Sequence, residues 1–75
     1  MPRSQHSARY KRFCVLLVES RRAKGLTQAE VARRLSKPQS YVAKYEGGER
    51  RLDVIEYLEI VEALGVPAAR LIRGL

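Results

Sequence analysis

Apolar residues recur every three or four positions along most of this chain, which is the spacing of an amphipathic α-helix. Glycines and prolines interrupt the pattern at residues 25, 38, 47, 48, 65, 67 and 74, and the segments between them are of helical length. No segment shows the sustained alternation of apolar and polar residues that a half-buried β-strand requires. The pattern therefore predicts an all-α domain.

The first helix is predicted over residues 10–24, with Gly25 as the glycine that ends it. At about 100° per residue, one face of this helix carries a mainly apolar set: Phe13, Leu16, Leu17 and Ser20. Arg21 lies at the edge of that face. A guanidinium beside a core is costly to desolvate unless a carboxylate pairs with it, so the sequence predicts an acidic partner for Arg21. Residues 1–9 are polar and basic, and we expect them to form a flexible arm.

A short second helix is predicted to begin after Thr27, which caps it while Glu30 reaches back to the backbone N–H of the cap. Its apolar side chains are expected to point toward the core: Val31, Ala32 and Leu35. Arg34 follows Glu30 at the i+4 position, a spacing that favours an ion pair. That ion pair is the interpretation that we prefer for Arg34.

The third helix is predicted over residues 38–46, with Pro38 in its first turn and the glycine pair at 47–48 as its end. A helix this short is marginal alone, so packing must hold it. Val42 and Tyr45 are expected to face inward, and Ala32 opposite Val42 permits a close crossing of the two short helices. The outward face is polar with one charge, and Tyr41 lies at its boundary; its members are Gln39, Ser40, Ala43 and Lys44.

An outward face of this kind has two interpretations. Polar side chains on a helix are most often plain surface. An α-helix also fits the major groove of B-form DNA, where glutamine pairs with adenine, lysine reaches guanine acceptors, serine donates or accepts, and alanine contacts the thymine methyl group. The base-reading residues that the sequence offers are therefore Gln39, Ser40, Ala43 and Lys44.

The fourth helix is predicted from its cap, Asp53, to Gly65, and a short fifth helix follows with Pro67 in its first turn. The apolar residues of the fourth helix span roughly 220° of arc, which is wider than the stripe that one core needs. Either this helix is central and buried on most sides, or part of it meets a second subunit. The candidates for a dimer interface are Tyr57, Ile60, Leu64 and Leu71, and the alternative is that they complete the core of the monomer.

Charge is distributed unevenly over the 75 residues, which carry a formal net charge of +7. Residues 1–51 hold thirteen bases and four acids, a net +9, whereas residues 52–75 hold two bases and four acids, a net −2. A basic half joined to a mildly acidic half is typical of a protein that meets a polyanion on one face. A merely soluble basic domain is the competing interpretation.

The single cysteine, Cys14, cannot form an internal disulfide, and together with the single histidine, His6, it provides no ligand set for a metal. We therefore expect no metal and no cofactor. The chain has no Ser–His–Asp set, paired carboxylate site or phosphate-cradling glycine loop, so an enzyme is the least favoured class. The longest apolar run, at residues 15–18, is too short to span a membrane, and no signal peptide is apparent. These features predict a protein of the reducing bacterial cytoplasm.

The stretch LTQAEVARRLSKPQSYVAKYEGGER, followed by LEIVEALGV, resembles the lambda-repressor-like, Cro-type (XRE) helix-turn-helix family. The resemblance covers about residues 10–73. It implies a five-helix DNA-binding domain over residues 10–75, with the helix-turn-helix at about residues 27–46. It also implies a transcriptional regulator, most often a repressor, that binds double-stranded operator DNA as a two-fold homodimer. An antitoxin-like or adaptor module that uses the same fold to bind a protein is the alternative function.

Residue by residue, the resemblance implies base contacts from Gln39, Ser40 and Lys44 and a structural ion pair between Arg21 and Glu46. The phosphate contacts that we expect are Gln28, Lys37, Tyr41, Arg50 and Arg51, with Arg3 or Arg9 of the arm in addition. One departure is Ser36, which stands where many relatives have glycine in the turn between the second and third helices. If that turn needs a positive φ, serine there costs on the order of 1 kcal/mol.

Overall fold

The computed structural model describes residues 7–75, and five α-helices account for most of that range. They are α1 (Ala8–Ala23), α2 (Gln28–Leu35), α3 (Gln39–Glu46), α4 (Val54–Leu64) and α5 (Ala68–Arg73). No residue between 7 and 75 is in a strand, so the prediction of an all-α, five-helix domain is confirmed. No helix in this part of the chain is long and apolar enough to cross a membrane.

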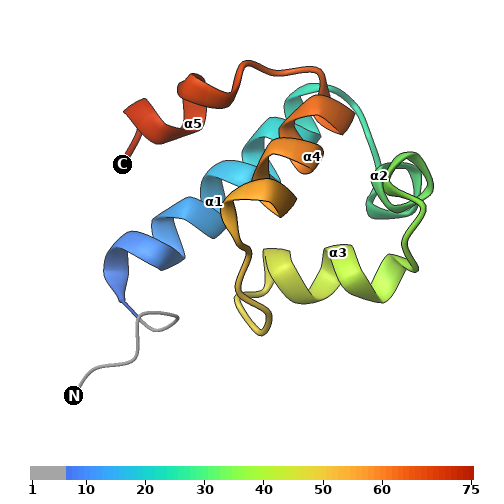
Figure 1. The fold of residues 1–75 in the computed structure, drawn as a ribbon, viewed down its shortest axis with the longest axis horizontal. Coiled ribbons are helices and arrows are strands. Elements are labelled where there is room, and N and C mark those ends of the chain that lie inside the picture. Colours follow the sequence, from blue (N-terminus) through green and yellow to red (C-terminus); the bar gives the residue numbers. More distant parts are fainter. Residues whose placement is uncertain (1–6) are drawn as a thin grey trace.

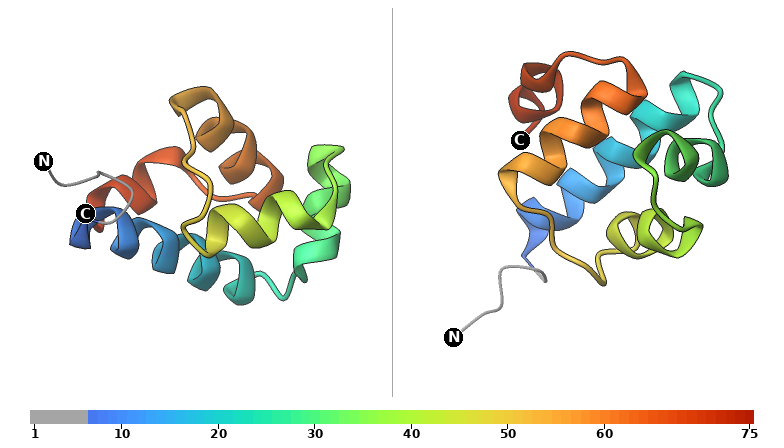
Figure 2. Two further views of the ribbon diagram at one scale, coloured as in Figure 1. Left: turned by 90° about the horizontal axis from the view of Figure 1, so that it is seen from below. Right: turned by 45° about the vertical axis from the view of Figure 1, so that its right-hand side comes forward.

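The principal contacts between helices close a ring. α1 packs on α3, α3 on α2, α2 on α4, α4 on α5, and α5 returns to α1. Figures 1 and 2 show α3 and the loop of residues 47–53 along one edge of the molecule, away from α5. α3 is therefore held from two sides by α1 and α2, while its remaining side lies at the outer edge.

The first helix begins earlier than its apolar periodicity indicates. Ser7 is the N-cap, and its hydroxyl oxygen accepts a hydrogen bond from the backbone N–H of Tyr10 at 3.0 Å. The predicted start at residue 10 and the predicted arm over residues 1–9 are therefore wrong for Ser7, Ala8 and Arg9, because a serine cap recruits a polar first turn. The rest of the predicted arm, including Arg3, lies outside the described residues.

The predicted caps Thr27 and Asp53 are both confirmed, and Glu56 is a partner of Asp53 that was not predicted. Thr27 and Glu30 make a reciprocal capping box at the start of α2, with N···O distances of 2.8 and 3.1 Å. Asp53 and Glu56 repeat that arrangement at the start of α4, with distances of 3.0 and 2.7 Å. These boxes satisfy backbone donors that have no partner inside their helices, so each helix start is specified locally.

The two prolines lie one position earlier than predicted. Pro38 and Pro67 are the N-caps of α3 and α5, with extended ψ values of 155° and 138°, and so are not in the first helical turn. The φ of a proline ring fits an extended residue as well as a helical one, and a cap residue also needs no backbone N–H for the helix.

Arg34 does not pair with Glu30. The Glu30 carboxylate accepts from the backbone N–H of Thr27, and this bond is the main reason that the pKa of Glu30 is lowered. Arg34 instead donates through Nη1 to the carbonyl oxygen of Ala63 at 2.8 Å, near the C-terminal end of α4. A cation is favoured where helical carbonyl groups lack partners, so the predicted ion pair gives way to a link between α2 and α4.

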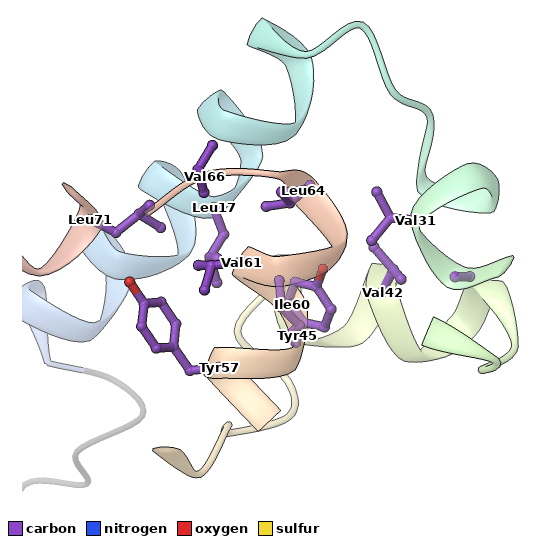
Figure 3. Close-up of a cluster of buried hydrophobic side chains, with 11 residues drawn as sticks. Leu17, Val31, Val42, Tyr45, Tyr57, Ile60, Val61, Leu64, Val66 and Leu71 are labelled. Atoms are coloured by element: carbon purple, nitrogen blue, oxygen red, sulfur yellow. The ribbon is translucent and has the colours of Figure 1, made fainter. Parts of the chain in front are cut away.

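All five helices contribute side chains to one core (Figure 3). Its largest fully buried members are Tyr45, Leu17, Ile60, Val31 and Val42. Burying a side chain of this size contributes roughly 1.5–3 kcal/mol. The inward faces predicted for α2 and α3 are confirmed, since Val31, Ala32, Val42 and Tyr45 are all buried.

The predicted dimer interface is part of this core. Tyr57, Ile60, Leu64 and Leu71 are only 7%, 0%, 2% and 2% exposed in the single chain. That prediction is therefore wrong, and the alternative, that these side chains complete the core of the monomer, is confirmed. The reason is the position of α4, which packs on both α2 and α5 and so has its main apolar face covered within one domain.

Candidate nucleic-acid interface

A sharp turn joins α2 to α3 and sets the direction of the second helix. Ser36 ends α2 with φ 57° and ψ 41°, and it is the one residue other than glycine with a positive φ among residues 7–75. The backbone N–H of Lys37 then donates to the carbonyl of Ala32 at 2.9 Å. The turn therefore does require a positive φ at Ser36, and this left-handed conformation costs a serine about 1–2 kcal/mol.

The outer face of α3 consists of Gln39, Ser40, Ala43 and Lys44, and all four residues are exposed. Val42 and Tyr45 attach the opposite side of the helix to the core. Because two buried side chains fix the helix and four exposed ones project from it, the outer face of α3 is presented on a rigid support.

An ion pair connects the C-terminal ends of α1 and α3. Arg21 donates through Nε and Nη2 to the two carboxylate oxygens of Glu46 at 2.7 and 3.1 Å. The side chains are 11% and 5% exposed, and Nη1 of Arg21 also donates to the carbonyl of Leu26 at 2.9 Å. Hydrogen bonding to Glu46 raises the pKa of Arg21. The acidic partner that the position of Arg21 required is therefore Glu46, and this prediction is confirmed.

Gln28 extends this ion pair toward the outer face of α3. Its Nε2 donates to Oε1 of Glu46 at 2.9 Å, and its Oε1 accepts from Nε2 of Gln39 at 3.5 Å. A chain of hydrogen bonds thus runs from Arg21 through Glu46 and Gln28 to Gln39. The sequence indicated Gln28 and Gln39 separately but gave no sign of this connection, because the four residues come from three helices.

Tyr41 is the centre of a second cluster, at the boundary of the outer face. Its ring meets the Tyr45 ring edge-on, with centroids 5.5 Å apart. The Lys37 ammonium lies 5.2 Å and the Arg50 guanidinium 4.9 Å from its centroid. Desolvation raises the pKa of Tyr41. Arg50 is also bound by Glu56, at 2.7 and 3.1 Å, so part of its charge is already compensated.

The remaining basic residues of this edge are less constrained. Lys37, Lys44 and Arg51 are exposed, and none of the three has an acidic partner within the described range. The Arg51 guanidinium lies 4.5 Å from the centroid of the Tyr10 ring. Tyr10 was not identified from the sequence as a site residue, because nothing local in residues 8–13 indicates a contact with a loop some 40 residues later.

The edge formed by α3 and the 47–53 loop (Figure 1) therefore combines a polar helix face with basic side chains beside it. Lys37 and Arg50 meet at Tyr41, and Arg51 follows Arg50 in the loop. Backbone N–H groups at the start of α2 lie next to Gln28, and a helix N-terminus favours anions. Such an arrangement suits a ligand that carries phosphates and a patterned groove.

Known proteins share this architecture. A family model described as a helix-turn-helix matches residues 17–71. An uncharacterised HTH-type transcriptional regulator of Sinorhizobium fredii is 44% identical over 52 residues, which are 69% of this chain and 68% of that relative.

Two solved structures are similar over nearly the whole domain. An XRE-family-like protein from Pseudomonas syringae pv. tomato matches with a TM-score of 0.86 and 46% identity, over 92% of this chain and 84% of that one. The restriction-modification controller protein C.AhdI from Aeromonas hydrophila matches with a TM-score of 0.79 and 32% identity, over 87% of this chain and 98% of that one. The fold, the turn geometry and these likenesses agree, and the chain belongs to the XRE family of helix-turn-helix proteins, a family of DNA-binding transcriptional regulators.

Proposed function

We propose that this protein binds double-stranded operator DNA in a sequence-specific manner and regulates transcription by inserting α3 into the major groove. The observation that carries the proposal is the outer face of α3, whose four residues are exposed while the other side of the helix is anchored in the core. An exposed helix of this width fits the major groove, where base edges differ in their donors and acceptors.

Base reading is assigned to the outer face of α3. Gln39 suits a bidentate pair with adenine, and Lys44 suits the acceptors of guanine. Ser40 adds a group that donates or accepts, and Ala43 offers a methyl group to thymine. The hydrogen bond from Gln39 to Gln28 limits the freedom of the Gln39 amide, which favours one orientation of its donor and acceptor.

Phosphate anchoring is assigned to Gln28, Lys37, Tyr41, Arg50 and Arg51. Gln28 stands at the N-terminus of α2, where backbone N–H groups and the helix dipole favour an anion. Lys37 and Arg51 are exposed cations without an acidic partner among residues 7–75. The guanidinium of Arg50 already pairs with Glu56, and a phosphate would compete with this carboxylate. We therefore expect Arg50 to contribute less to DNA affinity than Arg51.

Two variants test this division. Lys44→Ala should change which duplex is preferred in a selection from random DNA, because it removes a base contact. Arg51→Ala should weaken binding to all duplexes about equally and reduce the slope of log K against log salt by about 0.9, the value for one phosphate. The assay is fluorescence anisotropy at several salt concentrations, and the opposite pattern for the two variants would overturn the assignment.

We also propose that the protein binds its operator as a homodimer and represses transcription by occupying it. A two-fold dimer places recognition helices about 34 Å apart, in successive major grooves. The support lies on α4, where Val54, Ile55 and Leu58 are 71%, 62% and 44% exposed. Apolar side chains grouped this closely on one helix are typical of a surface that meets a partner.

Sedimentation velocity tests the dimer. Ile55→Lys should shift the protein from dimer to monomer at micromolar concentration, because a charge would replace an apolar contact. Val15→Lys is the matched control, since Val15 is an exposed apolar residue on α1. A monomeric wild-type protein in the presence of operator, or equal effects of the two variants, would contradict the proposed interface.

The exposed apolar residues of α4 also favour the second candidate, a protein-interaction module. Titration with random duplex DNA at low and moderate salt separates the two functions, since nonspecific DNA binding is electrostatic and falls with salt. Micromolar protein that shows no salt-sensitive binding would support the interaction module and count against the regulator.

A further inference from the structure

Tyr10 links the beginning of α1 to the loop that precedes α4. Its hydroxyl oxygen accepts a hydrogen bond from the backbone N–H of Leu52 at 3.2 Å, and its O–H donates to the backbone carbonyl of Arg50 at 3.5 Å. Its ring lies 4.5 Å below the guanidinium of Arg51. One side chain thus contacts three consecutive residues of a loop that is 40 to 42 positions away in sequence.

The Tyr10 side chain is itself held in place. Its ring packs on Phe13 with centroids 5.6 Å apart, and Phe13 packs on Tyr57 at 5.5 Å. The Tyr57 hydroxyl donates to the carbonyl of Ala68, at the start of α5. Three rings therefore connect the loop of residues 50–52 to α1, α4 and α5, and burial within this group raises the pKa of Tyr10.

The two arginines of the loop differ in how many of their guanidinium N–H groups are already hydrogen-bonded. Arg50 uses its guanidinium N–H groups on Glu56 and on the carbonyl of Arg51. The Arg51 guanidinium lies over the Tyr10 ring, and among residues 7–75 it makes no ion pair with a carboxylate. A cation–π contact uses no N–H hydrogen bond, so the donor fork of Arg51 remains available for a phosphate.

We propose that Tyr10 is a positioning residue of the DNA interface, which fixes the 50–52 loop and aims the Arg51 guanidinium at a phosphate. The inference rests on the proposed DNA binding and assigns Tyr10 no direct contact with DNA. The contact with Tyr10 restricts the Arg51 side chain before DNA binds. An arginine without such a contact loses considerable rotamer freedom when it binds a phosphate, and this loss weakens binding.

Two substitutions separate the functions of the side chain. Tyr10→Phe removes the hydroxyl and keeps the ring under Arg51, whereas Tyr10→Leu removes both. We expect Tyr10→Leu to weaken binding to operator and to random duplex by a similar factor, about twofold to fivefold, which corresponds to one exposed cation–π contact. Tyr10→Phe should keep most of the affinity but speed hydrogen exchange of the Leu52 amide, which loses its acceptor.

A double-mutant cycle distinguishes positioning from a general structural role. In an Arg51→Ala background, Tyr10→Leu should change affinity less than about 1.5-fold, because the two side chains act together. In a Lys44→Ala background, Tyr10→Leu should retain its full effect. Urea unfolding of each variant verifies that the folded population is complete at the assay temperature. Tyr10→Met, which also removes the ring, replaces Tyr10→Leu in the cycle if the latter is not folded.

The outcomes are distinguishable from failure of DNA binding itself. If the wild-type protein binds no duplex, the proposed function fails and the positioning role fails with it. Unchanged hydrogen exchange of the Leu52 amide in Tyr10→Phe refutes only the claim that Tyr10 fixes the 50–52 loop. If the wild type binds but Tyr10→Leu has equal effects in both backgrounds, the positioning role of Tyr10 is refuted and the proposed function stands.

Discussion

The largely buried ion pair between Arg21 and Glu46, whose side chains are 11% and 5% exposed, gives the most direct test of what holds α3 in place. Arg21→Ala removes one partner, and Arg22→Ala is the matched control, since it changes the neighbouring arginine, which is exposed. The two variants delete the same charge and the same number of atoms. They differ in whether a buried carboxylate is left without its partner.

The structure sets the expected size of the effect. Removing one member of a buried pair typically costs about 3–5 kcal/mol. Glu46 keeps the hydrogen bond from Gln28, which is worth about 1 kcal/mol, so we expect a loss near the lower end, about 3 kcal/mol. Arg22→Ala should cost less than about 0.5 kcal/mol. A domain of this length has a total stability of roughly 4–11 kcal/mol, so the first loss is severe.

Urea unfolding monitored by circular dichroism at neutral pH measures the difference. Arg21→Ala should lower the midpoint with little change in the slope m, since the same surface is exposed on unfolding. The melting temperature should fall by more than about 10 °C, at roughly 4–8 °C per kcal/mol for a domain of this size.

A double-mutant cycle with Glu46→Ala checks the cause of the loss. The sum of the two single losses in unfolding free energy should exceed the loss of the double variant by at least about 1 kcal/mol, because the second deletion removes the uncompensated charge. Equal losses for Arg21→Ala and Arg22→Ala, or strict additivity in the cycle, would refute the reasoning that the pair braces α1 against α3.

Three further predictions concern single sites. Ser36→Gly should stabilise the domain by about 0.5–1 kcal/mol, because it relieves the strain of a serine in the left-handed conformation. Ser40→Gly, on the exposed side of α3, should destabilise it by about 0.5 kcal/mol. Thermal melts measure both changes, and a loss of stability in Ser36→Gly would contradict the strain. Hydrogen bonds from its arginine partner and from the α4 cap lower the pKa of Glu56 from 4.5, so its contribution to stability is complete above that value and is lost as the pH falls through the lowered pKa. Glu56→Gln should therefore lose less stability than the wild type between neutral and acid pH, and parallel curves would count against it. Ile60→Ala should cost roughly 2–5 kcal/mol in urea unfolding, whereas Ile72→Ala, at a residue that is 53% exposed, should cost less than about 0.5 kcal/mol. Similar costs would contradict the assignment of Ile60 to the core and Ile72 to the surface.

The site was predictable only in part. The outer face of α3 and the pair between Arg21 and Glu46 were indicated by periodicity, by one misplaced charge and by a family resemblance. The hydrogen bonds that join Gln28 to Glu46 were not indicated, because side chains 18 residues apart meet only after three helices have packed. Tyr10 was missed for the same reason.

The sequence by itself determined where α2 and α4 start, where α3 and α4 end, and which residues α2 and α3 bury. These properties depend on neighbours within about one turn: a capping residue and its partner three positions later, a glycine after the last turn, an apolar stripe. Thr27, Asp53 and Gly65 act at this range, so no distant contact was needed to interpret them.

Only the tertiary structure decided how the wide apolar surface of α4 is divided. The sequence could not distinguish a central helix from a dimer interface, because both place apolar residues around most of a helix. Packing on α2 and α5 buries Tyr57, Ile60 and Leu64 and leaves Ile55 and Leu58 exposed. Periodicity tells on which face of a helix a residue lies. Which other helix packs against that face depends on contacts between segments far apart in the chain.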